Sequence, residues 1–220
     1  MEDTIRNTPE NLFAVYKEIG PTSHDIMYRI KRLFPGEKVG HAGTLDPLAS
    51  GILVVGVGRQ ATKKLHTEQL NEKEYIAEVT LGQSSSTDDA EGEKLSWSVS
   101  EYPSEQNIRA ALKRFIGTIN QVPPAFSAIK RAGVPAYKLA RRGQEVQLSA
   151  RPALIREIEL LSYHWPILRI RVVTGRGVYI RSLARDIGSS LGVGGFISQL
   201  ERTRVGQFGL EDVVKLENLR

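Results

Sequence analysis

The segment Gly51-Ile-Leu-Val-Val-Gly-Val-Gly58 limits the possible folds more than any other part of the sequence. Its continuous apolar run, bounded by glycine, predicts a strand that is buried on both faces. A half-buried strand is predicted over residues 73–82, because apolar and polar residues alternate there. The apolar positions of that strand are Tyr75, Ala77, Val79 and Leu81.

Helices are predicted among these strands. Capping by Thr22 or Ser23 and apolar residues at helical spacing predict a helix that ends before Pro35-Gly36. A second helix follows Ser104, with Ile108, Leu112 and Ile116 facing inward. Further helices are predicted over residues 136–142, 178–191 and 196–201, and further strands over 12–16, 154–163 and 167–173. Because strands and helices mix without regular alternation, we predict an α+β fold around a mixed, largely antiparallel sheet.

Several kinds of chemistry are excluded or unsupported. The chain has no cysteine, which excludes disulfides, thiol catalysis and zinc sites with sulfur ligands. Its four histidines are far apart, and neither GxxxxGK[ST] nor GxGxxG occurs. No run reaches the roughly 18 to 20 apolar residues of a membrane helix, and the N-terminus has no apolar signal core. We therefore expect a cytoplasmic protein with no metal, no cofactor and no membrane partner.

Positive charge is concentrated in one part of the chain. The net charge is +5, yet residues 126–204 contain fourteen Lys and Arg against five Asp and Glu. Such a segment is typical of a protein that binds a polyphosphate such as nucleic acid. A solvated cationic face with no ligand would explain the charge equally well.

The loop from Gly40 to Gly51 contains the best candidate for a catalytic group. Pro47 keeps Asp46 out of the helical conformation, and the buried strand that follows holds the loop rigid. A carboxylate in this position can act as nucleophile, general base or electrostatic stabiliser. Taken alone, the pattern is also that of an ordinary turn, and His41 is equally well explained as a loop or core histidine.

The run HAGTLDPLASGILVV, residues 41–55, closely resembles the catalytic-loop signature of TruB-type pseudouridine synthases. Other segments match motifs of the same family in the same order, from about Phe13 to Phe208. They are Gly20-Pro-Thr-Ser-His-Asp25, Lys73-Glu-Tyr75 with Leu81-Gly82 and Asp89-Ala-Glu-Gly92, Gln121-Val-Pro-Pro-Ala-Phe-Ser-Ala-Ile-Lys130, Gly177-Val-Tyr179-Ile-Arg181-Ser-Leu183, and Leu200-Glu-Arg-Thr203-Arg-Val-Gly206-Gln-Phe208.

The resemblance implies an enzyme that converts the uridine at position 55, in the T loop of tRNA, to pseudouridine. It also implies a central sheet flanked by helices, with an RNA-binding cleft. The reaction exchanges a C–N glycosidic bond for a C–C bond and needs no redox partner or group donor, which agrees with the expected lack of a cofactor. The target uridine must be flipped out of its stack before it can react.

The resemblance also implies roles for individual residues. Asp46 is the catalytic carboxylate, Arg181 is the cation that favours its ionised form, and Tyr75 supports the flipped base. Tyr179 and Leu200 line the base pocket with Tyr75, and His41 helps hold the rearranged T loop. On spacing alone, Tyr75, Tyr179 and Leu200 are packing residues. The residues expected to contact the RNA backbone are Lys130, Arg131, Lys138, Arg141 and Arg142.

For the organisation of the chain, we expect one catalytic domain over residues 1–220. A basic, thumb-like insertion is expected at about 125–150, and the PUA domain of many bacterial relatives is not expected. The enzyme should then act as a monomer on the T arm alone. A guide-RNA-dependent synthase is one alternative, although Ala42 and Leu48-Ala-Ser-Gly51 favour the stand-alone type. A non-enzymatic tRNA-binding or tRNA-folding module is another.

Overall fold

The computed structural model describes residues 11–131 and 133–219, and they form two compact units. The first unit contains the residues up to Ile76 and those from Leu200 onward, and the second contains Ala77–Gln199. Strands β4 (Lys73–Leu81) and β12 (Gly195–Val205) contribute residues to both units. Among the residues that the structure describes, none of the helices combines the length and the hydropathy of a membrane-spanning segment.

The first unit is built on strand β3. Strands β1 and β2 pair with it in the antiparallel direction, and β12 pairs with it in the parallel direction, with Leu200 opposite Ala49. Two helices and two short 3-10 turns complete the unit. The elements are β1 (Leu12–Lys17), α1 (Ser23–Leu33), β2 (Val39–His41), β3 (Ala49–Val57), α2 (Arg59–Leu70), η1 (Leu210–Asp212) and η2 (Leu216–Asn218).

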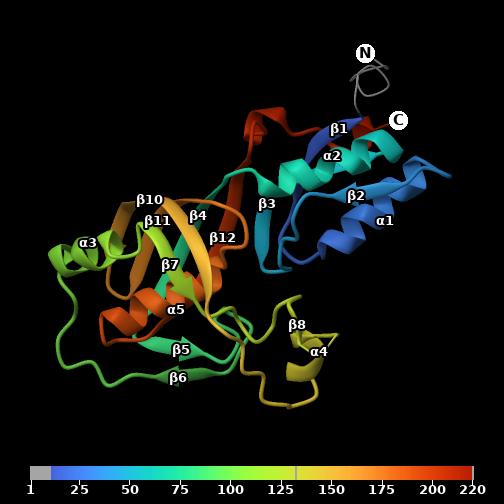
Figure 1. The fold of residues 1–220 in the computed structure, drawn as a ribbon. Coiled ribbons are helices and arrows are strands. Elements are labelled where there is room, and N and C mark those ends of the chain that lie inside the picture. The colour runs from blue at the N-terminus through green and yellow to red at the C-terminus, as the bar shows by residue number, and fades with distance from the viewer. Residues whose placement is uncertain (1–10, 132, 220) are drawn as a thin grey trace. The chain divides into compact units, whose positions relative to one another are not determined.

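Helices α1 and α2 cover opposite faces of the β1–β3 pair (Figure 1). One apolar cluster joins Leu53, Val55 and Val57 of β3 to α1. The other joins Ile52 and Val54 to Leu65 of α2. Successive side chains of a strand point to opposite faces, so β3 is buried on both sides, as predicted.

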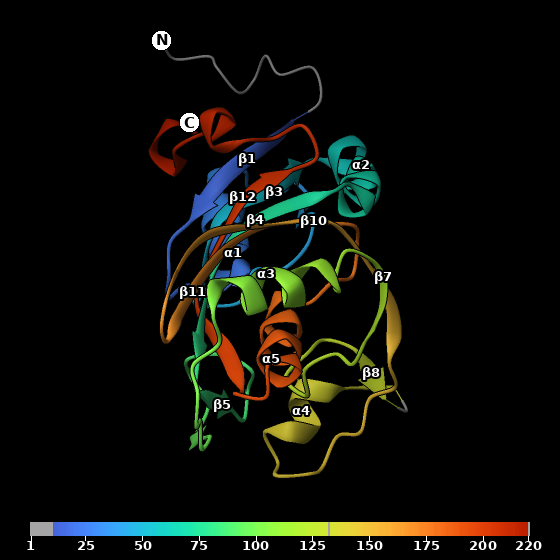
Figure 2. The ribbon, with the colours of Figure 1, turned by 90° about the vertical axis from the view of Figure 1, so that its left-hand side faces the viewer.

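The second unit contains the strand sequence β4, β11, β10 and β7, in which β10 is antiparallel to both of its neighbours. Helices α3 and α5 lie side by side (Figure 2). Two small hairpins, β5–β6 and β8–β9, are added. The elements are β5 (Gln83–Ser85), β6 (Lys94–Ser96), α3 (Glu105–Lys113), β7 (Gly117–Gln121), β8 (Lys130–Arg131), β9 (Val134–Pro135), α4 (Ala136–Ala140), β10 (Arg151–His164), β11 (Ile167–Thr174) and α5 (Ile180–Ser190).

The predicted mixed, largely antiparallel sheet with flanking helices is confirmed, and so is the Thr22 cap of α1. Two predictions are wrong. Residues 196–201 belong to strand β12, whose buried start (Gly195–Ile197) has a short apolar run that periodicity cannot assign to strand or helix. Ile116 is 47% exposed, because α3 ends at Lys113 and the chain has left the inward helical face.

Candidate active site

Asp46 lies in the loop between β2 and β3, and it is half-buried. Its carbonyl oxygen accepts a hydrogen bond from the Ala49 N–H (3.1 Å), which closes a turn at the start of β3. The Gly20 N–H donates to the Pro47 carbonyl (2.8 Å). Two backbone hydrogen bonds within the first unit therefore fix the turn that follows the Asp46 carboxylate.

Ser23, the first residue of α1, fixes the other side of Asp46. Its hydroxyl donates to the Leu45 carbonyl (3.0 Å) and accepts from the Leu45 N–H (2.9 Å). The side chain is buried, at 2% exposure, so these bonds are shielded from water. A serine hydroxyl can both donate and accept, and here it satisfies the whole backbone of one loop residue.

Arg202 of β12 ties the start of the loop to strand β3. Its Nη2 donates to the Gly43 carbonyl (3.1 Å) and its Nε to the Ile52 carbonyl (2.8 Å). The residue is 1% exposed. A buried guanidinium must be hydrogen-bonded to be tolerated, and these carbonyl acceptors supply part of that need. Arg202 therefore stabilises the conformation of the loop.

Lys17 supplies a positive charge close to Asp46 within the first unit. Its Nζ donates to the carbonyls of Glu18 and Pro21 (both 2.9 Å) and lies 3.4 Å from that of Pro47. Burial lowers the pKa of Lys17, and the negative charge of Asp46 acts against this decrease. Neither Lys17 nor Arg202 is among the predicted site residues. The signal for Lys17 is a lysine that continues the apolar strand LFAVYK.

Lys73 is a third buried cation of the first unit. Its Nζ donates to the Asn71 carbonyl (3.0 Å), and a Cβ placed on Gly43 would lie 3.5 Å from its Cε. Burial, followed by the charge of Arg202, lowers the pKa of Lys73 from its usual value to about 8. The loop that carries Asp46 thus packs against a positively charged interior.

The other predicted residues of the first unit are His41, Tyr75 and Leu200. Tyr75 and Leu200 are both 8% exposed, and Leu200 is paired with Ala49, three residues after Asp46. Burial, followed by the charge of Arg202, lowers the pKa of His41, so the neutral imidazole is favoured. The register of β12 against β3 is what brings Leu200 to the end of the loop.

Arg181 lies in the first turn of α5, in the second unit, and is almost completely buried. Its Nη1 is 3.2 Å from Asp89 Oδ2 and 3.1 Å from the Thr87 carbonyl, and its Nη2 donates to the Phe126 carbonyl (2.9 Å). The other Asp89 oxygen accepts from the Glu91 N–H (3.0 Å). Asp89 belongs to a matched family segment, but no role was predicted for it. Asp46 and Arg181 belong to different units, and their proximity stays a prediction.

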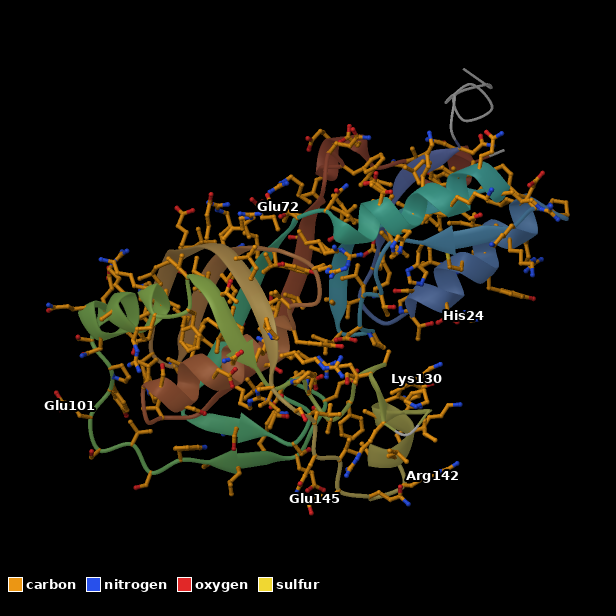
Figure 3. The ribbon with its side chains drawn as sticks, in the orientation of Figure 1. His24, Glu72, Glu101, Lys130, Arg142 and Glu145 are labelled. Carbon is orange, nitrogen blue, oxygen red and sulfur yellow. The ribbon has the colours of Figure 1, made fainter. Side chains whose placement is uncertain are left out.

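The basic insertion, expected at about residues 125–150, contains the five cations expected to bind RNA. All five side chains are exposed, and the side chains of Lys130 and Arg142 extend away from the ribbon in Figure 3. The Arg141 guanidinium lies over the Tyr137 ring, 5.6 Å from its centre. A hollow of about 470 Å³ is lined by Ile129, Lys130, Arg131, Gln147, Leu148, Ser149 and Arg151. The predicted cluster of positive charge is therefore present on this surface.

Metal chemistry has no candidate site in residues 11–131 and 133–219. There, no three His, Asp or Glu side chains form a group that could hold an ion.

Tyr179, the last predicted pocket residue, is half-buried and directly precedes α5.

Residues 31–180 match the family model described as TruB family pseudouridylate synthase, N-terminal domain. The chain belongs to the TruB family. Residues 181–220 match the C-terminal domain of tRNA pseudouridylate synthase B. The resemblance inferred from the motifs is confirmed, whereas the single-domain organisation stays a prediction.

Relatives in the TruB family include tRNA pseudouridine synthase B of Mycobacteroides abscessus, 47% identical over 94% of this chain and 71% of that protein. The protein of the same name from Thermobifida fusca is 44% identical over 96% of this chain and 74% of its own length. Among solved structures, a Cbf5–Nop10–Gar1 complex contains a chain that is 33% identical, with a TM-score of 0.71. This chain spans about half of that one, 52% of its length.

Proposed function

We propose that this TruB-family chain isomerises the uridine at position 55 of tRNA to pseudouridine. The observation that carries the proposal is the position of Asp46 in the family's signature loop, whose backbone is held by hydrogen bonds from the buried side chains of Ser23, Arg202 and Lys17. A carboxylate on a fixed backbone is suited to attack on the sugar or the base, or to removal of a sugar proton. Relatives 44–47% identical to the chain carry the name tRNA pseudouridine synthase B.

In the proposed reaction, the N1–C1′ bond of the uridine breaks and the uracil rotates within the pocket. A bond between C5 and C1′ then forms, the proton on C5 is released and N1 gains a proton. Asp46 assists the first bond cleavage, and Tyr75, Tyr179 and Leu200 hold the detached base. Arg181 provides the positive charge that keeps Asp46 ionised.

The basic insertion is proposed to grip the T arm while the uridine is flipped out. Unstacking a base costs a few kcal/mol, which contacts to the RNA backbone offset. The backbone contacts come from Lys130, Arg131, Lys138, Arg141 and Arg142. His41 holds the rearranged loop, and the cytoplasmic, monomeric protein acts without a protein partner.

The test uses the chain alone and an unmodified tRNA transcript. Carbodiimide labelling followed by primer extension should show one new stop, caused by pseudouridine at position 55, and none in a transcript with cytidine there. The absence of pseudouridine at any position would contradict the enzymatic function. Pseudouridine at other positions only would contradict the proposed site.

A guide-dependent reaction is the second candidate, since a chain in an archaeal box H/ACA complex is 32% identical over 94% of this chain. The same assay separates the stand-alone from the guide-dependent reaction, because it contains no guide RNA.

An isolated T-arm stem-loop is expected to react nearly as fast as the whole tRNA. A large loss of rate on the stem-loop would show that contacts outside the T arm are needed.

A further inference from the structure

Helix α5, which carries Arg181, begins in a different way from α1 and α3, the two long helices whose N-cap side chains are polar. In α1, the N–H of the N-cap residue Thr22 donates to the Asp25 side chain (2.8 Å), three residues along the same helix. In α3, the Ser104 N–H donates in the same way to Asn107 (3.0 Å). Both helices are therefore capped by their own side chains.

Helix α5 takes its cap from strand β7. The N-cap residue Tyr179 has no side-chain cap, and the third helical residue, Ser182, donates its hydroxyl to the Val122 carbonyl (2.9 Å). The Tyr179 N–H donates instead to Gln121 Oε1 (2.8 Å), and Gln121 Nε2 donates back to the Tyr179 carbonyl (3.1 Å). These partners are 58 residues apart in the sequence.

The side chain of Gln121 is suited to holding the backbone of Tyr179. It is 2% exposed, and its amide satisfies both backbone groups of one residue. Only a group that accepts and donates at once can do this, which a primary amide does at every pH. Loss of the amide would remove the hydrogen bond to the Tyr179 N–H and one of the hydrogen bonds to its carbonyl, which also accepts from the Leu183 N–H (3.0 Å).

The chain that follows Gln121 makes further contacts with the first two turns of α5. The Val122 carbonyl also accepts from Arg185 Nη2 (2.8 Å), and the Phe126 carbonyl accepts from Arg181 Nη2. Residues 121–126 run from the end of β7 into the basic insertion. One short segment therefore connects the RNA-binding surface to the start of the helix with Arg181.

We propose that Gln121 is a positioning residue, which fixes Tyr179 and the first turn of α5 in the geometry needed by the flipped uridine. The proposal rests on the proposed function, because that function gives Tyr179 and Arg181 their roles. It assigns to Gln121 no contact with the reacting atoms.

The test compares wild type with Gln121→Glu and Gln121→Met, and uses Gln106→Glu and Gln106→Met as matched controls. Gln106 is exposed on α3. Tritium release from tRNA labelled at uridine C5 is measured in single turnovers with saturating enzyme. Filter binding gives the Kd for tRNA, and circular dichroism gives the folded fraction. At about pH 8, both Gln121 variants should react about tenfold slower or worse, with a Kd within about threefold of wild type.

The two variants should differ in their pH dependence. A protonated glutamic acid has the same shape as glutamine and both donates and accepts, and burial raises the pKa of such a group. The ratio of the Gln121→Glu rate to the wild-type rate should therefore rise at least about threefold from about pH 8 to about pH 5.5. The corresponding ratio for Gln121→Met should stay constant.

Rates within twofold of wild type, or a Gln121→Glu ratio that does not change with pH, would overturn the assignment. If Gln121→Met does not fold, the pH ratio of Gln121→Glu decides alone. Wild-type release with unaffected variants would refute only the role of Gln121. No release by the wild type would refute the proposed function, and the positioning role with it.

Discussion

Replacement of Lys73 by methionine is expected to stabilise the protein more at neutral pH than at high pH. Burial and Arg202 lower the pKa of Lys73 from 10.5 to about 8 in the folded chain. Between these values the unfolded chain holds a proton that the folded chain has lost, so the free energy of unfolding rises with pH. The cost of burying the ammonium is complete below pH 8, and at 1.36 kcal/mol per pKa unit it amounts to about 3 kcal/mol.

The measurement is urea unfolding of wild type and Lys73→Met, followed by circular dichroism at pH 7 and pH 10. The difference in free energy of unfolding, variant minus wild type, should be larger at pH 7 by about 2 to 3 kcal/mol. Comparing differences removes the constant contribution of the lost hydrogen bond to Asn71. The control Lys63→Met, at an exposed position of α2, shows the effect of losing a surface lysine. A Lys73→Met difference equal at both pH values would refute the reasoning.

Three further predictions concern packing, an unpaired hydroxyl and RNA binding. Gly51→Ala should lower the free energy of unfolding by more than about 3 kcal/mol, since its Cβ would lie 2.2 Å from the Arg202 carbonyl oxygen. Gly36→Ala, also at positive φ but in open space, should cost about 1 kcal/mol, and equal losses in urea unfolding would contradict the steric argument. Ser127→Ala should raise the free energy of unfolding by about 1 kcal/mol, and with it the melting temperature, because the buried Ser127 Oγ has no hydrogen-bond partner in the described residues. A lower melting temperature would contradict this and show that the hydroxyl has a partner. Arg142→Gln should reduce the slope of log Kd for tRNA against log salt by about 1, and an unchanged slope would remove Arg142 from the RNA contacts.

The parts of the fold that could be predicted are those coded over short distances. Alternation over Lys73–Leu81 and the capping pattern at Thr22 each involve neighbouring residues, and both predictions are confirmed. Helix α2 has no such signal, because it begins after Gly58 without a side-chain cap and its middle is rich in polar residues. The sequence pattern predicts a helix over residues 196–201 of strand β12, because the identity of that strand depends on pairing with distant strands.

The same limit applies to the candidate site. Asp46 could be predicted because its loop carries a specific motif. The tertiary contacts around the predicted residues could not, because Arg202 is 159 residues from Gly43 and Asp89 is 92 residues from Arg181. Lys17 looks like an ordinary strand end until the fold brings the 46–47 turn to it. Local patterns therefore indicate the proposed catalytic carboxylate, and tertiary structure is needed to find the residues that hold its loop.

The most direct test of the account is tritium release from tRNA labelled at uridine C5, with wild type and Asp46→Asn compared in single turnovers. Asparagine keeps the shape of aspartate but cannot serve as a carboxylate nucleophile or base. We expect complete release by the wild type and none by the variant, with both proteins binding tRNA equally well. Equal release by the two proteins would contradict the central role of Asp46.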